Sequence, residues 1–102
     1  MNRGPLGRGL RVFFSEGSER TLFTQALECD RKGDVFGAFH LYMKVAELRG
    51  HLRVEALNNA AVILAEHGFV SQAIGILREA LWEDADNERV RENLSILEGK
   101  GQ

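Results

Sequence analysis

"RKGDVFGAFHLY", residues 31–42, has a counterpart 35 residues later in "EHGFVSQAIGIL", residues 66–77. The shift of 35 residues aligns glycines, alanines and larger apolar residues in pairs: Gly33 with Gly68, Val35 with Val70, Ala38 with Ala73, Leu22 with Leu57 and Ala26 with Ala61. An internal repeat of this length is typical of proteins that stack copies of one structural unit. The sequence therefore predicts two copies of such a unit.

Each unit is expected to contain two helices that meet at the glycine. Apolar residues recur at steps of three and four on both sides of Gly33 and of Gly68, which is the spacing of one helix face. A glycine with a positive φ angle ends a helix without steric cost. We expect helices at about 19–32, 35–49, 52–66, 70–84 and 87–98.

Polar residues mark the first and last of the expected helix starts. Ser18 is expected to cap the first helix, and Asp86 or Asn87 the last, because their side-chain oxygens accept bonds from free backbone N–H groups. The only proline, Pro5, lies outside all of the expected helices. The starts of the middle helices carry weaker signals.

Composition and charge are those of an ordinary small globular protein. The 102 residues suit one domain, in which we expect residues 1–18 to be an N-terminal arm, flexible or docked, and residues 19–102 to be a helical repeat domain. A formal net charge of -2 gives no general attraction to nucleic acid or to an anionic membrane. Cys29 is the only cysteine, and no apolar run suits a secretory signal or a membrane span. We therefore expect a cytoplasmic protein.

The repeat unit resembles the tetratricopeptide repeat (TPR), a helix pair of about 34 residues with small and large apolar residues at fixed positions. The matching positions are Leu22, Gln25, Ala26, Cys29, Ala38, Tyr42 and Gly50 in the first unit and Leu57, Ala60, Ala61, Leu64, Ala73, Leu77 and Ala85 in the second. A truncated third unit with Arg91, Leu94, Ser95 and Glu98 is interpreted as a cap. The signature tryptophan and proline are missing, and Gln25 replaces the usual apolar residue. The resemblance implies an all-α fold of antiparallel helix hairpins in a TPR-like α-solenoid, and a generic bundle of four or five helices is the alternative.

The resemblance also implies a concave groove, lined by the first helix of each pair, that holds a peptide or helix of a partner protein. The residues expected to bind the partner are Arg20, Phe23, Leu27, Asn58, Asn59, Val62, Glu66, Arg89, Asn93 and Ile96. Leu27, Val62 and Ile96 are expected to form an apolar column. Asn59 and Asn93 are expected to lie one above the other, where their amides can donate to and accept from an extended backbone.

One other interpretation of this surface remains open, and a second is not supported. Asn58 and Asn59 can simply occupy the solvated face of their helix. A clamp for a C-terminal carboxylate, which some members of the family have, is not supported. Phe23 and Leu27 stand where that clamp has its first lysine and asparagine.

Three aromatic residues lie outside the repeat's apolar pattern: Phe36, Phe69 and Trp82. Exposed aromatics on one side of a small solenoid can mark an interface, because tryptophan and phenylalanine are enriched in interface cores. The alternative, which we favour slightly for Trp82, is that its indole packs against the last helix near Val90 and Leu94.

The N-terminal arm combines Arg3, Arg8 and Arg11 with several glycines. We expect its apolar residues Leu10, Val12, Phe13 and Phe14 to dock on the repeats or on a partner. A disordered tail and a weak contact with phosphate backbones are the alternatives.

No pattern predicts catalysis. The three histidines show no metal-ligand spacing, and Cys29 belongs to an apolar stripe, where thiols are usually inert. We therefore expect no enzyme, no cofactor and no metal. The leading hypothesis is a small TPR-like adaptor or scaffold that binds another protein. The alternative is a structural protein that self-assembles into a homo-oligomer through open repeat faces, because two repeats and a cap fall short of the usual three.

Overall fold

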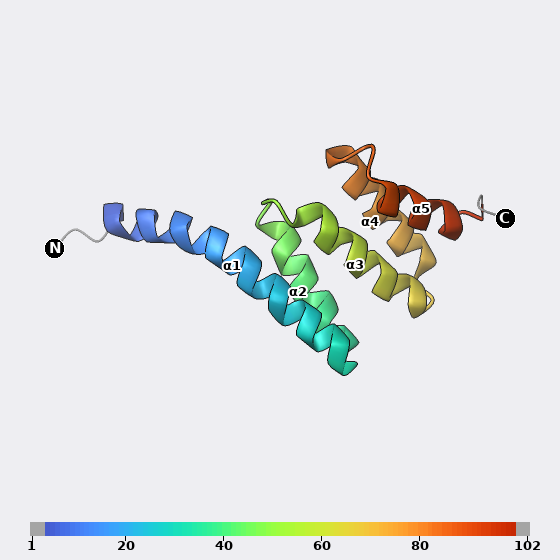
Figure 1. Ribbon diagram of the computed structural model, residues 1–102, viewed down its shortest axis with the longest axis horizontal. Helices are drawn as coiled ribbons and strands as arrows, with labels where there is room; N and C mark the ends of the chain where they lie inside the picture. Colours follow the sequence, from blue (N-terminus) through green and yellow to red (C-terminus); the bar gives the residue numbers. More distant parts are fainter. Residues whose placement is uncertain (1–3, 100–102) are drawn as a thin grey trace.

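The computed structural model describes residues 4–99 of the chain, with side chains from Ser18 onward. In this part the chain forms helices and no strand. The helices are α1 (Gly4–Lys32), α2 (Val35–Glu47), α3 (Arg53–Glu66), α4 (Val70–Glu83) and α5 (Glu88–Leu97). Each helix packs beside the next in a helical repeat arrangement, which confirms the expected all-α class (Figure 1). None of the described helices combines the length and the apolarity needed to cross a membrane.

The turns between paired helices are the glycine turns expected from the repeat. Gly33 follows α1 and Gly68 follows α3, and both have a φ angle of 89°, a conformation that costs a residue with a side chain about 1 kcal/mol or more. The Asp34 carboxylate then caps α2 by accepting a bond from the Gly37 N–H at 3.0 Å. At α5 the cap is Asn87, whose side-chain oxygen accepts from the Val90 N–H at 3.0 Å.

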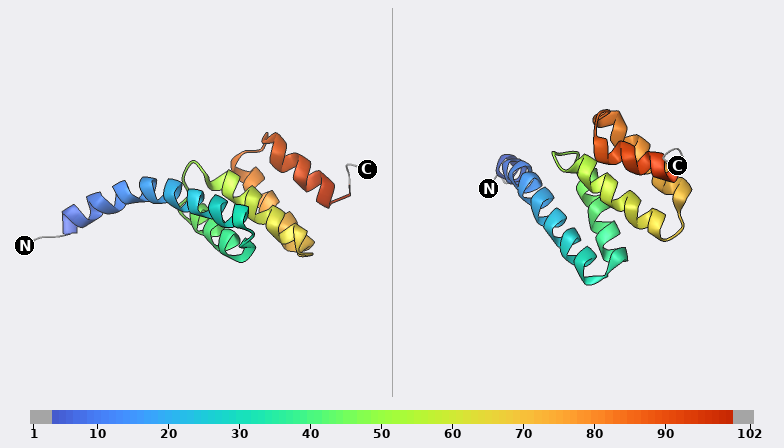
Figure 2. Two further views of the ribbon diagram at one scale, coloured as in Figure 1. Left: turned by 60° about the horizontal axis from the view of Figure 1, so that its bottom comes forward. Right: turned by 45° about the vertical axis from the view of Figure 1, so that its right-hand side comes forward.

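The start of α1 differs from the expectation. We expected this helix to begin near residue 19, with Ser18 as its cap and Pro5 outside it, whereas α1 begins at Gly4 and Ser18 lies inside it. Pro5 is tolerated because it occupies the first turn, where a backbone N–H has no helical partner to lose. The first half of α1 extends beyond the other helices (Figure 2). The expected docking of Leu10, Val12, Phe13 and Phe14 concerns side chains outside the described ones.

Alanines at the helix crossings allow the close packing that the repeat predicts. Ala26, Ala38, Ala61 and Ala73 are all fully buried. Around them, Tyr42, Leu57 and Leu77 fill the space between helices, again with almost no exposed surface. One cluster of buried residues joins α1, α2 and α3, and a second joins the end of α2, through Ala46, to α3, α4 and α5. Both α2 and α3 therefore contribute to both halves of the core.

A buried carboxylate joins α1 to the turn between α2 and α3. Glu19 accepts a bond from the Leu52 N–H at 2.9 Å, and this N–H lies at the start of α3. Gly50 makes room for that carboxylate, because a side-chain carbon at residue 50 would lie 2.3 Å from a Glu19 oxygen. The start of α3 has no side-chain cap within its own turn, and Glu19 of α1 binds this backbone N–H instead.

Candidate functional site

Two hollows lie along α3 on the side that faces α1 and α5. The first has a volume of about 250 Å³ and is lined by Leu27, Asp30, Tyr42, Asn59, Val62, Ile63 and Glu66. The second has a volume of about 120 Å³ and is lined by Val62, Ala65, Glu66, Leu77, Asn93, Ile96 and Leu97. Because Val62 and Glu66 belong to both, the hollows form one surface across α1, α3 and α5, which we name the inner groove.

The inner groove contains most of the residues that the sequence predicted to bind a partner. Leu27, Val62 and Ile96 line it from three different helices, and Leu27 and Ile96 are exposed. Asn59 and Glu66 lie beside Val62 in the same groove. The expected apolar column is therefore present as a strip of apolar surface that a ligand can reach.

Polar groups at one end of the groove are fixed by bonds within the chain. The Tyr42 hydroxyl donates to the Asp30 carboxylate at 3.0 Å. Burial raises the pKa of the Tyr42 phenol above its usual range, and Asp30 raises it further, whereas Asn59 acts in the opposite direction. Tyr42 consequently stays a neutral hydrogen-bond donor over the whole physiological pH range.

Asn58 and Asn93 hold α3 and α5 together. The Asn93 amide donates to the Asn58 side-chain oxygen at 3.0 Å. Asn58 is only 3 % exposed, so the interpretation that it lies on the solvated face of its helix is wrong. We expected Asn93 to lie above Asn59, but its hydrogen-bond partner is Asn58. Asn59, half-buried in the groove, is therefore the amide better placed to meet a ligand.

Besides Asn58, three other predicted site residues lie outside the lining of the inner groove. Phe23 is buried in the core, where its ring lies 5.7 Å from the ring of Tyr42. Arg20 is exposed on α1. Arg89 lines a separate hollow of about 490 Å³ near the starts of α3 and α5, together with Glu55 and Glu88.

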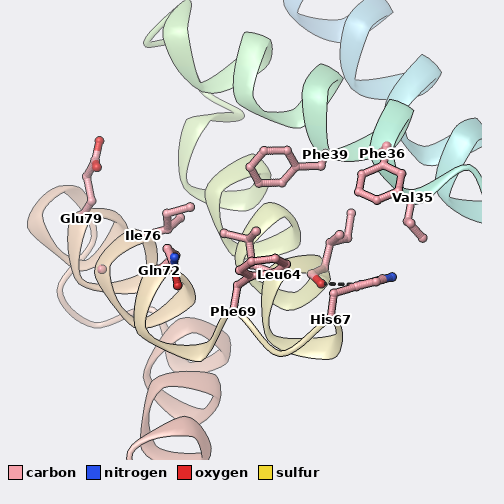
Figure 3. A pocket seen from close by; sticks show the side chains of 11 residues that line it. Val35, Phe36, Phe39, Leu64, His67, Phe69, Gln72, Ile76 and Glu79 are labelled. Atoms are coloured by element: carbon pink, nitrogen blue, oxygen red, sulfur yellow. Dashed lines mark hydrogen bonds between the residues drawn. The ribbon is translucent and has the colours of Figure 1, made fainter.

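A larger hollow lies on the opposite side of α3, between α2 and α4 (Figure 3). It has a volume of about 790 Å³ and is lined by Val35, Phe36, Phe39, Ile63, Leu64, His67, Phe69, Gln72, Gly75, Ile76 and Glu79. In Figure 3 the rings of Phe36 and Phe39 face Leu64 and Ile76 across an open space. We name this mostly apolar surface the outer cleft.

Arg53 lies beyond one end of the outer cleft, where it binds the lining residue Glu79. Its guanidinium donates to the Ala46 carbonyl at 2.6 Å, to the Glu83 carboxylate at 2.6 Å and to the Glu79 carboxylate at 2.5 Å. These three bonds join the start of α3 to the ends of α2 and α4. The sequence analysis missed this cluster. A usable signal was the four-residue spacing of Glu79 and Glu83, which places two carboxylates on one helix face.

Of the three aromatic residues outside the repeat's apolar pattern, Trp82 does not pack as expected. We favoured packing of Trp82 against α5 near Val90 and Leu94, but this is wrong because Trp82 is 86 % exposed. Val90 is fully buried without it. Phe36 and Phe69 are also exposed, and both line the outer cleft.

The described residues offer few groups for chemistry. Among them, no three His, Cys, Asp or Glu side chains come together as metal ligands. Cys29 is half-buried, and burial, followed by the nearby Asp34 carboxylate, raises the pKa of its thiol. A raised pKa keeps the sulfur in its less reactive thiol form. His67 donates from Nδ1 to the Ile63 carbonyl at 2.9 Å.

Comparisons of the chain with protein-family models, with curated proteins and with solved structures found no match.

Proposed function

We propose that the protein is a small interaction module, similar to a TPR adaptor, that binds a peptide or helix of another protein in the inner groove. The observation that supports this most directly is the continuity of the groove across α1, α3 and α5. Leu27, Val62 and Ile96 offer apolar contacts along it, and they come from three consecutive repeat positions. A single extended segment that crosses the three helices can contact all of them.

The polar groups of the groove suit recognition of a peptide backbone. Asn59 offers both a donor and an acceptor beside the apolar strip. The neighbouring Tyr42–Asp30 and Asn58–Asn93 bonds hold the groove walls in place before any ligand arrives. Groups that are already ordered lose less conformational entropy on binding, so this arrangement favours affinity.

The compartment we propose is the cytoplasm. The single free thiol of Cys29 suits a reducing environment, where it stays unpaired.

A library of random peptides displayed on phage tests the proposed groove. Peptides selected on the wild-type chain are synthesised with a fluorophore, and their affinity is measured by fluorescence anisotropy. Leu27→Ser and Ile96→Ser change exposed side chains, so the fold is kept, and we expect each to weaken binding about tenfold. Trp82→Ser, which changes an exposed side chain outside the groove, is the matched control and should leave affinity unchanged.

The opposite result contradicts the proposal. If the selected peptides lose affinity with Trp82→Ser and keep it with the two groove variants, the binding surface is elsewhere. If the library yields no peptide that the wild-type chain binds, the inner groove is not a peptide site.

A further inference from the structure

The outer cleft is an apolar surface that the described chain leaves uncovered. Phe36, at its edge, is 80 % exposed, and Phe69 is about half exposed. Between them lie the partly buried side chains of Phe39, Leu64 and Ile76. Large uncovered apolar surfaces of this kind usually mark a place where another segment docks.

Gly75 indicates that the docking segment approaches closely. It lies in the middle of α4, where glycine lowers helix stability by about 1 kcal/mol relative to alanine. Its φ angle is not in the left-handed region, and a side-chain carbon built on it meets no atom within 4 Å. Nothing in the described chain therefore requires glycine here. A side chain at this position would instead reduce the space of the outer cleft, so glycine lets a foreign backbone come near α4.

The cleft is electrically polarised along its length. At one end the Arg53 guanidinium faces two carboxylates, Glu79 and Glu83, which leaves one negative charge in excess. The helices α2 and α4 both end here, as the Arg53 bond to the Ala46 carbonyl shows, so their dipoles add negative charge. At the other end the start of α4 has no side-chain cap and carries positive partial charge, whereas the Asp34 carboxylate already offsets this charge at the start of α2. A helix that docks antiparallel to α2 and α4 matches this field.

A segment with the matching properties is the first half of α1. Residues 4–17 are helical in the structure, and 14 residues of helix span about 21 Å, the same as the 14 residues of α4. In the sequence of this segment Leu6, Leu10 and Phe13 follow at steps of four and three, which places them on one face of a helix. Its first part carries Arg8 and Arg11, and its end carries Glu16.

This segment also needs a packing partner. It contains four glycines, and each costs a helix about 1 kcal/mol relative to alanine. Helices of such composition are stabilised by tertiary packing and not by intrinsic propensity. Because α1 is one continuous helix whose first half extends beyond the other helices, residues 4–17 are not positioned to cover the outer cleft of their own chain (Figures 1 and 2).

We propose that the outer cleft binds residues 4–17 of a second copy of the chain. The segment lies antiparallel to α2 and α4, with Leu6, Leu10 and Phe13 toward the apolar wall and its backbone near Gly75. This direction brings the basic first part of the segment to Glu79 and Glu83, and it brings Glu16 to the uncapped start of α4. Reciprocal exchange of the segment between two chains gives a dimer.

The solution mass of the full chain, measured by light scattering over a concentration series, is the first test. We expect a shift from monomer to dimer with concentration in the wild-type chain. Gly75→Ala should raise the dimer dissociation constant about tenfold or more while raising thermal stability, so a loss of dimer cannot be attributed to unfolding. Ser71→Ala, another exposed position of α4 outside the cleft, is the matched control and should keep the wild-type behaviour.

A fluorescent synthetic peptide of residues 1–17 identifies the occupant. It should bind the full wild-type chain, and Phe36→Ala or Gly75→Ala in the chain should weaken this binding about tenfold. The same peptide with Leu10→Ser and Phe13→Ser should not bind. Leu27→Ser and Ile96→Ser, which lie in the inner groove, should change neither the mass nor the peptide affinity, so this test is independent of the proposed peptide site.

Two results would overturn the inference. One is a monomer at every concentration together with no binding of the peptide. The other is self-association that Gly75→Ala and Phe36→Ala leave unchanged, which would assign the interface to a different face, such as that of Trp82.

Discussion

The two sides of α3 differ in how the chain treats its polar and apolar groups. On the inner groove side, Tyr42 is bonded to Asp30 and Asn58 to Asn93, and apolar residues appear as a narrow strip between these bonds. On the outer cleft side, the wall is mostly apolar, with His67, Gln72 and Glu79 among its lining residues, and the bonds of Arg53 lie at the end where Glu79 stands. Both sides are hollow, but the inner one has its polar groups arranged beside a narrow apolar strip.

This difference indicates that the inner groove and the outer cleft favour different occupants. A groove with ordered amide and hydroxyl groups beside an apolar strip offers hydrogen bonds to a peptide backbone. A broad apolar cleft with a glycine in its wall offers close packing to a helix, which satisfies its own backbone. Within residues 18–99, every buried side-chain nitrogen or oxygen has a hydrogen-bond partner. Neither hollow therefore arises from buried polar side chains that lack hydrogen bonds.

The largest expected effect on the free energy of unfolding concerns Phe23, on the inner groove side, and we compare it with Phe36 at the outer cleft. Phe23 is 9 % exposed and packs on Tyr42 below the groove, whereas Phe36 stands at the edge of the cleft. Phe23→Ala should lower the free energy of unfolding by about 3 kcal/mol, because it leaves a cavity. Phe36→Ala should change it by less than about 0.5 kcal/mol. Urea denaturation followed by circular dichroism measures both, and equal effects would remove the distinction between the two sides.

Arg53→Ala tests whether the Arg53 end of the outer cleft is a structural junction. Loss of the guanidinium leaves the Ala46 carbonyl and two carboxylates without their partner, and we expect the free energy of unfolding to fall by about 2 kcal/mol. This value allows for the partial exposure of Glu79 and Glu83. The control is Arg78→Ala, which breaks the exposed pair with Glu98 and should cost less than about 0.5 kcal/mol. A similar loss in the free energy of unfolding for both variants would show that the Arg53 bonds stabilise the junction no more than the Arg78–Glu98 pair stabilises its own site.

Asn58→Ala tests the polar bond that joins α3 to α5. The change leaves the half-buried Asn93 amide without its acceptor, and we expect a loss of about 1–2 kcal/mol in the free energy of unfolding. A double-mutant cycle with Asn93→Ala isolates the pair, and its coupling energy should be at least about 0.5 kcal/mol. Additive effects of the two substitutions would mean that the bond contributes no stability.

Tyr42→Phe should lower the free energy of unfolding at neutral pH by about 1 kcal/mol, because it removes the bond to Asp30. The pH dependence is more informative. The folded state raises the pKa of the phenol, so the unfolded chain, with an ordinary pKa of about 10, releases the proton first. Wild-type stability should therefore fall as pH rises above about 10, and it should fall less steeply in Tyr42→Phe. Parallel curves for the two proteins would contradict the raised pKa.

The repeat explains why so much of the fold could be predicted from sequence. Gly33 and Gly68 end helices because of a local backbone requirement, and Ala38 and Ala73 are buried because a helix crossing needs small residues. Such requirements act within one or two helical turns, so they leave a readable pattern. The apolar column of Leu27, Val62 and Ile96 was expected from the resemblance to the TPR, which places these residues at equivalent positions of successive units. The start of α1 was not predicted, because the glycines and Pro5 near the start of the chain suggested an arm outside the helices.

By itself, the sequence determined the all-α class, the two glycine turns, the pairing of helices and the apolar strip of the inner groove. Only the tertiary structure decided that Asn93 binds Asn58, that Arg53 joins three helix ends and that Trp82 stays exposed. It also decided that an apolar cleft opens between α2 and α4. The physical reason is that these features depend on the distance and rotation between helices that are far apart in the chain. Periodicity fixes which residues share a face of one helix, but packing fixes which faces meet.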